Sequence, residues 1–227
     1  MVSTTPATDA ISANFHVLAK GTQVAGYTTG SSDIRWTTAQ FAEFPDAVRI
    51  DQDPAATDHT ADILDVENGA ATPADCAAWA KQAQLSFHNA VRPGQRDPGI
   101  YCSKSMITPV VNALVSGGVV HCNLWVASWG IGANGALSML NASAGPYPVV
   151  GVQYQDNGSF DSDMFLTSWL KNRSSKTDPP KVASPPGQWD NPKFWTWKEA
   201  AILGTGLDGQ LHLFVFDPAK GDWNKAA

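Results

Sequence analysis

Two carboxylic acids, Asp65 and Glu67, stand one residue apart where the apolar run "ADILDVE" ends and Asn68-Gly69 follows. In a strand, residues two apart project from the same face, about 6.6 Å from each other along the backbone. Carboxyl groups this close oppose each other's ionisation, so one of them holds its proton more tightly. A protonated acid beside an ionised carboxylate is the pairing used to hydrolyse glycosidic bonds: one group protonates the leaving oxygen while the other stabilises positive charge on the sugar or activates a nucleophile.

A simpler reading is that both acids are solvated at a strand end, with Asp65 helping to cap the next helix. The surrounding sequence favours the chemical reading, because an apolar run leads directly into the acids. A capped helix follows, in which Thr72 can serve as the cap and Pro73 suits the first turn. If helices cover the outer face of the strand, the two acids point into the mouth of a barrel, at the carboxyl end where α/β barrels carry their chemistry.

Short β-like runs alternate with helix-like or loop segments between residues 24 and 170. Segments 33–44 and 103–118 resemble helices, and the order strand, helix, strand implies parallel strands with right-handed crossovers. Some connections are too short for a helix, so we expect an α/β fold in the form of an irregular TIM-type (β/α) barrel. The β-like runs are residues 24–29, 47–52, 61–67, 99–103, 123–129 and 149–155.

The chain divides by composition into three parts. We expect the barrel over residues 1–172, a Pro/Ser-rich linker over 173–188 and a Trp-rich β-hairpin appendage over 189–227. Asp208-Gly209 marks the hairpin turn. A segment this short cannot hold a core alone, so it must dock on the barrel, pair with a partner protein or self-associate.

Charge and composition exclude several classes of function. The net charge of −6 leaves no basic patch for nucleic acid. No apolar run reaches the roughly 18 residues that suggest a membrane span, and the N-terminus lacks the basic start and apolar stretch of a signal peptide. The three cysteines do not form a disulfide framework, so we expect free thiols. Metal-binding and phosphate-loop motifs are absent, and we expect neither a metal nor a cofactor.

Other residues could contact a sugar at the same end of the barrel. Trp129 lies at the carboxyl end of its strand, where its ring could stack on a sugar face, although it could equally be a core or rim residue. Tyr27 ends an earlier strand. Gln153 and Tyr154 lie on opposite strand faces, so only one points inward, and Gln153 could hydrogen-bond a carboxylate or a sugar hydroxyl.

The order of four motifs resembles glycoside hydrolase family 25, the lysozyme-type muramidases found in phage lysins and bacterial wall enzymes. These motifs are "ILDVEN", "GIYCSKSMI", "LWVASW" and "VQYQDNGSFDSDMF", and together they span about residues 24–170. The resemblance implies that Glu67 is the catalytic acid, Asp65 its partner and Asp161 a third carboxylate. Asp163 is an alternative for that third role, because the register of "FDSDMF" is ambiguous.

The chain departs from this family pattern at the first strand. In the family that strand normally ends in a catalytic-site aspartate close to a glycine, whereas "VAGYTTGSSD" has no acid before Asp33. We therefore expect that Asp33, Asp51 or Asp53 substitutes for it, or that the site has lost a member.

Two functions of different classes follow. The first is a lysozyme-like hydrolase that cleaves the glycan strand of peptidoglycan, with chitin or another wall glycan as a weaker option for the substrate. The second is a weakened or inactive barrel that binds carbohydrate or forms part of a phage virion, which the missing acid and the appended hairpin both favour. The lack of a signal peptide fits a phage endolysin or a virion-associated protein acting at the bacterial cell wall.

Overall fold

The structure is a computed structural model that describes residues 2–55, 61–88, 97–140 and 142–174, together with four strands nearer the C-terminus. The chain divides into two compact units, Met1–Lys176 and Thr177–Ala227, and each is described by itself.

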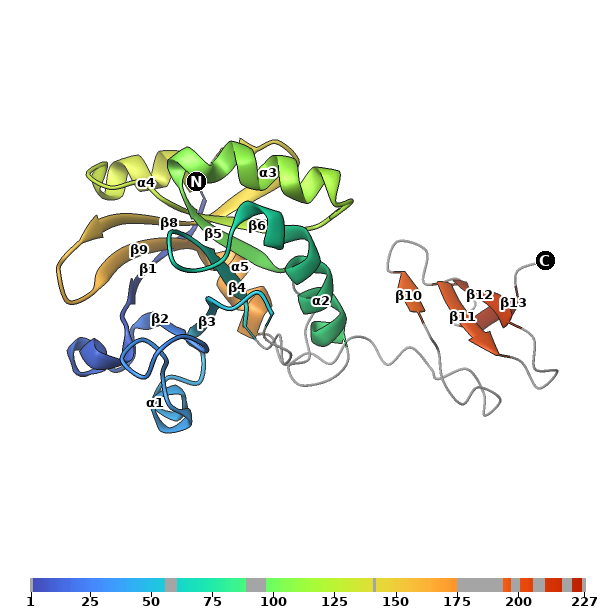
Figure 1. Cartoon of the computed structure of the whole chain (residues 1–227), viewed down its shortest axis with the longest axis horizontal. Coiled ribbons are helices and arrows are strands. Elements are labelled where there is room, and N and C mark those ends of the chain that lie inside the picture. Colours follow the sequence, from blue (N-terminus) through green and yellow to red (C-terminus); the bar gives the residue numbers. More distant parts are fainter. Residues whose placement is uncertain are drawn as a thin grey trace. The chain divides into compact units, whose positions relative to one another are not determined.

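The first unit is a closed barrel of eight strands within the described part of the chain (Figure 1). The strands follow the order β6-β5-β4-β3-β2-β1-β9-β8, and β6 pairs with β8 to close the barrel. All neighbours are parallel except β9, which runs antiparallel to both β8 and β1. The expected α/β barrel is therefore confirmed. Its strands are β1 (Thr4–Asp9), β2 (Gln23–Tyr27), β3 (Val48–Asp51), β4 (Ile63–Val66), β5 (Gly99–Ser103), β6 (Asn123–Ala127), β8 (Tyr147–Asp156) and β9 (Asp161–Leu166).

Helices pack against the outside of the barrel, but they do not follow every strand (Figure 1). Only a 3₁₀ turn, η1 (Ser12–Val17), separates β1 from β2, which makes the barrel irregular. The two-residue strand β7 (Ser143–Ala144) pairs with β8 alone. The other elements are α1 (Thr38–Glu43), η2 (Pro73–Asp75), α2 (Cys76–His88), η3 (Lys104–Met106), α3 (Ile107–Ser116), α4 (Gly132–Leu140) and α5 (Thr167–Ser174).

The helix expected after Glu67 is present and begins as its sequence predicts. The backbone N–H and the hydroxyl of Thr72 both donate to Asp75 Oδ2, at 2.9 and 2.6 Å, and Pro73 occupies the first turn. This capping arrangement satisfies donors that a helix start leaves without partners. It fixes where the chain turns away from β4 and therefore where Glu67 stands.

Alternating side chains separate the barrel interior from the helix layer. Ile63 packs inside with residues of β2, β3 and β6, whereas Leu64 and Val66 pack outside against the helices. The predicted division of the "ILDV" strand between two faces is thus confirmed, and it directs Asp65 inward with Ile63.

Aromatic rings fill the interior below the mouth of the barrel. The ring centroids of Tyr101 and Trp125 are 5.0 Å apart, those of Trp125 and Phe165 4.9 Å, and those of Phe165 and Trp169 5.3 Å. A Cβ at Gly151 would lie 2.4 Å from the Phe165 ring, so this position must lack a side chain. The interior below the mouth is therefore a packed core.

Two strands of the barrel differ from the sequence-based expectation. The barrel begins with β1, upstream of the run at 24–29 that was expected to open it, and it includes β9, which none of the expected runs covers and which is antiparallel to its neighbours. Strand β1 reads "TTPATD", with little apolar character and a proline that lowers its resemblance to a strand. The Asn157–Phe160 turn connects β8 directly to β9, which leaves no length for a parallel crossover.

The three cysteines are free and buried, as expected. Within the described residues, no helix is both long and apolar enough to cross a membrane.

The C-terminal unit contains a four-stranded antiparallel sheet in the order β10-β11-β12-β13. Strands β11 and β12 pair antiparallel, starting with Thr205 opposite Leu211, and form the expected hairpin. The Asp208-Gly209 turn and residues 175–193 lie outside the described residues. The appendage thus has two strands more than a hairpin. Its strands are β10 (Phe194–Thr196), β11 (Ala201–Thr205), β12 (Leu211–Asp217) and β13 (Asp222–Lys225).

Candidate active site

Five carboxyl groups meet at the mouth of the barrel, where the parallel strands end. Asp9 is the last residue of β1, Asp65 lies near the end of β4 and Glu67 follows that strand. Because β9 is antiparallel, its first residues lie at the same end, and this brings Asp161 and Asp163 into the cluster. Asp9 pairs directly with Asp161 across the β1–β9 ladder.

The five acids lie at different depths. Asp9, Asp65 and Asp163 are 4, 2 and 0% exposed, respectively. Asp161 is half-buried and Glu67 is exposed. A bound molecule can therefore touch Glu67 and Asp161, and Asp9 borders the same pocket as Asp161, whereas Asp65 and Asp163 line neither pocket.

A buried amide connects two of these acids. Gln153 Nε2 donates to both carboxyl oxygens of Asp9 at 3.3 Å and to Asp161 Oδ2 at 3.1 Å. The hydroxyl of Tyr101 donates to Gln153 Oε1 from the other side. Gln153 therefore points into the barrel, whereas Tyr154 packs against the outer core.

The remaining buried acids have few hydrogen-bond partners in the described structure. Asp65 Oδ2 accepts from Gln52 Nε2 at 3.0 Å, but Asp65 Oδ1 has no hydrogen bond. Neither oxygen of Asp163 has one. An ionised carboxylate without partners is costly to bury, so these groups favour the protonated form.

Burial raises the pKa of the acids at this mouth, and their neighbours raise it further. The pKa of Asp9 rises from 3.8 to about 7, chiefly because it is buried and also because Asp161 lies beside it. The pKa of Asp65 rises to about 7 through burial, with a smaller contribution from Glu67. Burial raises the pKa of Asp163 well above its usual range.

The two accessible acids also bind protons more tightly than usual. Partial burial, Asp156 and Glu67 raise the pKa of Asp161 to about 6. Shielding by neighbouring side chains raises the pKa of Glu67, and an interaction with the Tyr101 hydroxyl opposes that shift. The cluster therefore contains both protonated and ionised carboxyls near neutral pH, which is the condition for acid and base roles to coexist.

Two pockets open at this end of the barrel. The Trp129 pocket holds about 240 Å³ and is lined by Asp9, Asp161, Tyr27 and the 49%-exposed Trp129, among others. The Glu67 pocket holds about 610 Å³, with Glu67 in its wall beside residues 68–73, 103, 105 and 106. No lysine or arginine lines either pocket, so the described walls offer no positive charge to the acids.

The sequence-predicted residues are brought together at this mouth. Asp161 lines a pocket and Asp163 does not, so the structure distinguishes the two candidates for the third carboxylate. Gln153 and Asp163 are fully buried, and the geometry gives them neighbours within the cluster rather than a surface for sugar.

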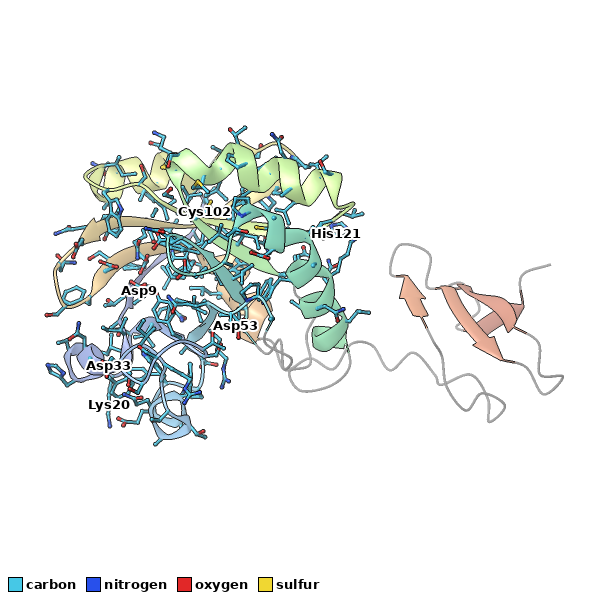
Figure 2. All side chains as sticks on the ribbon, in the orientation of Figure 1. Asp9, Lys20, Asp33, Asp53, Cys102 and His121 are labelled. Carbon is cyan, nitrogen blue, oxygen red and sulfur yellow. The ribbon has the colours of Figure 1, made fainter. Side chains whose placement is uncertain are left out.

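The expectation about the first strand was wrong. That strand is β1 and ends in an acid, Asp9, which sequence reasoning missed. Asp51 points to the outer face, where Trp79 Nε1 donates to it at 3.1 Å. Asp33 and Asp53 are exposed, and Figure 2 shows both away from Asp9. A signal for Asp9 existed in the threonines of "TTPATD", which suit a strand, and in the acid at its end.

Among the described residues, no group of three or more histidine, cysteine, aspartate or glutamate side chains is arranged to hold a metal ion. Comparison of the chain with protein-family models, with curated proteins and with solved structures found no match.

Proposed function

We propose that this protein hydrolyses the glycan strand of peptidoglycan. The observation that carries the proposal is the meeting of accessible and buried carboxyls between two open pockets at the carboxyl end of an α/β barrel. Hydrolysis of a glycosidic bond needs one protonated acid and at least one carboxylate on opposite sides of the bond.

Glu67 is the general acid in this proposal. It is exposed in the wall of the larger pocket, so it can reach the oxygen that leaves. Partial burial raises its pKa, which favours the protonated form that can donate a proton.

Asp161 supplies the carboxylate that faces the sugar. It lines the Trp129 pocket together with its strand neighbour Asp9, and its ionised form places negative charge where the anomeric carbon becomes positive. Asp65 is buried beside Glu67, and the negative charge of Glu67 helps to raise the pKa of Asp65.

Two aromatic side chains provide the contact surface for a sugar ring. Trp129 is half exposed and Tyr27 lines the same pocket, so both present apolar faces beside the acids. The choice of peptidoglycan over chitin or another wall glycan rests on the resemblance of four motifs to the family 25 muramidases.

A second function keeps the same pockets but lacks turnover: a carbohydrate-binding or phage virion protein. The separate C-terminal unit supports it, because its four-stranded sheet has two edge strands that can pair with another chain. Both functions act at the bacterial cell wall, either as a phage lysin or as a virion-associated protein.

The deciding experiment is digestion of purified peptidoglycan by wild-type protein and by Glu67→Gln. We expect wild-type protein to release soluble fragments with new sugar reducing ends, and the variant to lose this activity by about 10²- to 10⁴-fold. Asp53→Asn is the matched control, since it removes an exposed acid from the next strand end. Binding of walls without new reducing ends would support the second function, and activity on chitin alone would change the substrate.

A further inference from the structure

We propose that Gln153 is a positioning residue that holds Asp9 and Asp161 in one fixed arrangement for the reaction. The inference rests on the proposed function and goes beyond it, because that proposal gives Gln153 no role. From the sequence, Gln153 could hydrogen-bond either a carboxylate or a sugar hydroxyl.

The hydrogen bonds determine which way the amide faces. An amide side chain has a donor end and an acceptor end, and here Tyr101 donates to the acceptor, Gln153 Oε1. The donor end, Nε2, must then face the two carboxyls. The opposite orientation would place the amide oxygen against the carboxyl oxygens of Asp9 and Asp161.

The donor end has one hydrogen for each acid. Nε2 lies 3.3 Å from both oxygens of Asp9 and 3.1 Å from Asp161 Oδ2. Asp9 and Asp161 occupy paired positions on neighbouring strands and repel each other when ionised. A neutral amide between them offsets this repulsion without the full positive charge that a lysine would add.

The backbone holds Gln153 firmly in place. It is 1% exposed and pairs with Ala127 of β6 on one side and Asp163 of β9 on the other. The register of the β8–β9 ladder shifts between Gln153 and Gln155, and irregularities of this kind redirect side chains beside functional sites. Such burial leaves no surface for a sugar, so its effect must pass through the two acids.

The first test needs no enzymatic activity. The side-chain NH₂ protons of Gln153, identified by their absence in Gln153→Met, are followed by ¹⁵N-resolved NMR between pH 4.5 and 8.5. We expect one proton to shift as Asp9 titrates and the other as Asp161 titrates. Asp161→Asn should remove one of the two transitions and retain the other. Amide protons that stay unchanged over this range would overturn the inference, whether or not the protein cleaves walls.

The second test uses cleavage of peptidoglycan. Gln153→Met should lower kcat by about ten- to a hundredfold with little change in KM, because misplaced reacting groups cost rates of this size. Loss of the amide donors should also move the lower limb of the pH–rate profile to higher pH, since they favour the ionised form of Asp9. Gln155→Met is the matched control: it makes the same change two residues along β8, where the side chain is exposed and donates to Asn157.

A conservative variant covers the case in which Gln153→Met does not fold. Tyr101→Phe removes the hydroxyl that orients the amide and keeps the aromatic ring in contact with Trp125. It should shift the pH–rate profile in the same direction by a smaller amount. If wild-type protein cleaves walls and both variants keep the kcat and pH profile of Gln155→Met, the positioning role is wrong while the hydrolase proposal stands.

Discussion

Two buried aspartates on neighbouring strands show how the same residue type serves opposite purposes in this barrel. Asp51 of β3 and Asp65 of β4 are 1 and 2% exposed. Asp51 faces the helix layer and accepts hydrogen bonds from Thr29 Oγ1 at 2.5 Å, Trp79 Nε1 at 3.1 Å and the Asp53 N–H at 3.0 Å. Asp65 faces the mouth and accepts one hydrogen bond, from Gln52.

Burial alone therefore does not mark the acids of the candidate site. The buried carboxyl of Asp51 accepts three hydrogen bonds, so it stabilises the connection between β3, the following loop and α2. Asp65 has an oxygen without a hydrogen bond, so its burial is uncompensated and its proton is held more tightly. We infer that a buried acid whose oxygens all accept hydrogen bonds has a structural role. A buried acid at the mouth of the barrel with an oxygen that accepts none can take part in the reaction.

The largest expected effect is a loss of activity on substitution of Asp65, which we do not expect for Asp51. Asp65→Asn should reduce cleavage of peptidoglycan by about 10²- to 10⁴-fold, because it removes the carboxyl coupled to Glu67. It should fold at least as stably as wild type, since an uncompensated buried acid becomes neutral. Reducing-end assays and urea unfolding on the same sample measure both quantities. A variant that keeps full activity would place Asp65 in the scaffold with Asp51.

The converse change should affect stability. Asp51→Ala removes the acceptor of three hydrogen bonds, and leaving a buried donor unsatisfied costs about 1–3 kcal/mol. Urea unfolding should show this loss, while the folded fraction keeps its activity per molecule. Unchanged stability with lost activity would reverse the assignment of the two acids.

The pH dependence of stability tests the whole cluster. Asp9 and Asp65 have pKa values of about 7 and Asp161 of about 6, all raised from 3.8. The folded state keeps protons that the unfolded state releases above pH 4, so their contribution to stability is complete below about pH 4. It is lost as the pH rises to about 7, and one pKa unit corresponds to about 1.4 kcal/mol.

Urea unfolding at half-unit steps of pH measures this trend. The free energy of unfolding should fall between pH 4.5 and 7.5, and the fall should be shallower in Asp65→Asn. A free energy that rises over this range would mean that other groups dominate and that the mouth acids are ionised in the folded state.

The smallest expected effect concerns Trp129, the proposed contact surface for a sugar ring. Trp129→Ala should weaken glycan binding by about 1–2 kcal/mol, seen as an increase in KM with kcat nearly unchanged, because a half-exposed ring contributes contact area rather than chemistry. Stability should change by less than about 0.5 kcal/mol, as for most surface substitutions. Isothermal calorimetry with soluble wall fragments provides the affinity, and an unchanged value would remove Trp129 from the site.

The apolar strands of the barrel were predictable from the sequence, and the polar ones were not. Runs such as "ADILDV" and "NLWVAS" are buried on both faces and stand out by hydrophobicity alone. Strand β1 has inner positions occupied by Ala7 and Asp9, so its pairing depends on neighbours in the barrel rather than on its own composition. The sequence of the strand itself does not show which neighbouring strands it will pair with.

The same limit applies to the candidate site. Glu67 and Asp65 were predictable because both stand at the end of one recognisable strand. Asp9 was missed with its strand, and the choice between Asp161 and Asp163 required the register of β9. The hydrogen bonds of Gln153 join β1, β5, β8 and β9, which closure of the barrel alone brings together.

The most direct test of the account is a titration of the side-chain carboxyl groups of wild-type protein by ¹³C NMR, with signals assigned from single Asp→Asn variants. The account predicts that Asp9 and Asp65 titrate near pH 7 and Asp161 near pH 6. Titration of all three near the ordinary aspartate value of 3.8 would contradict it, because the carboxyls at the mouth of the barrel would then be ionised and solvated rather than buried.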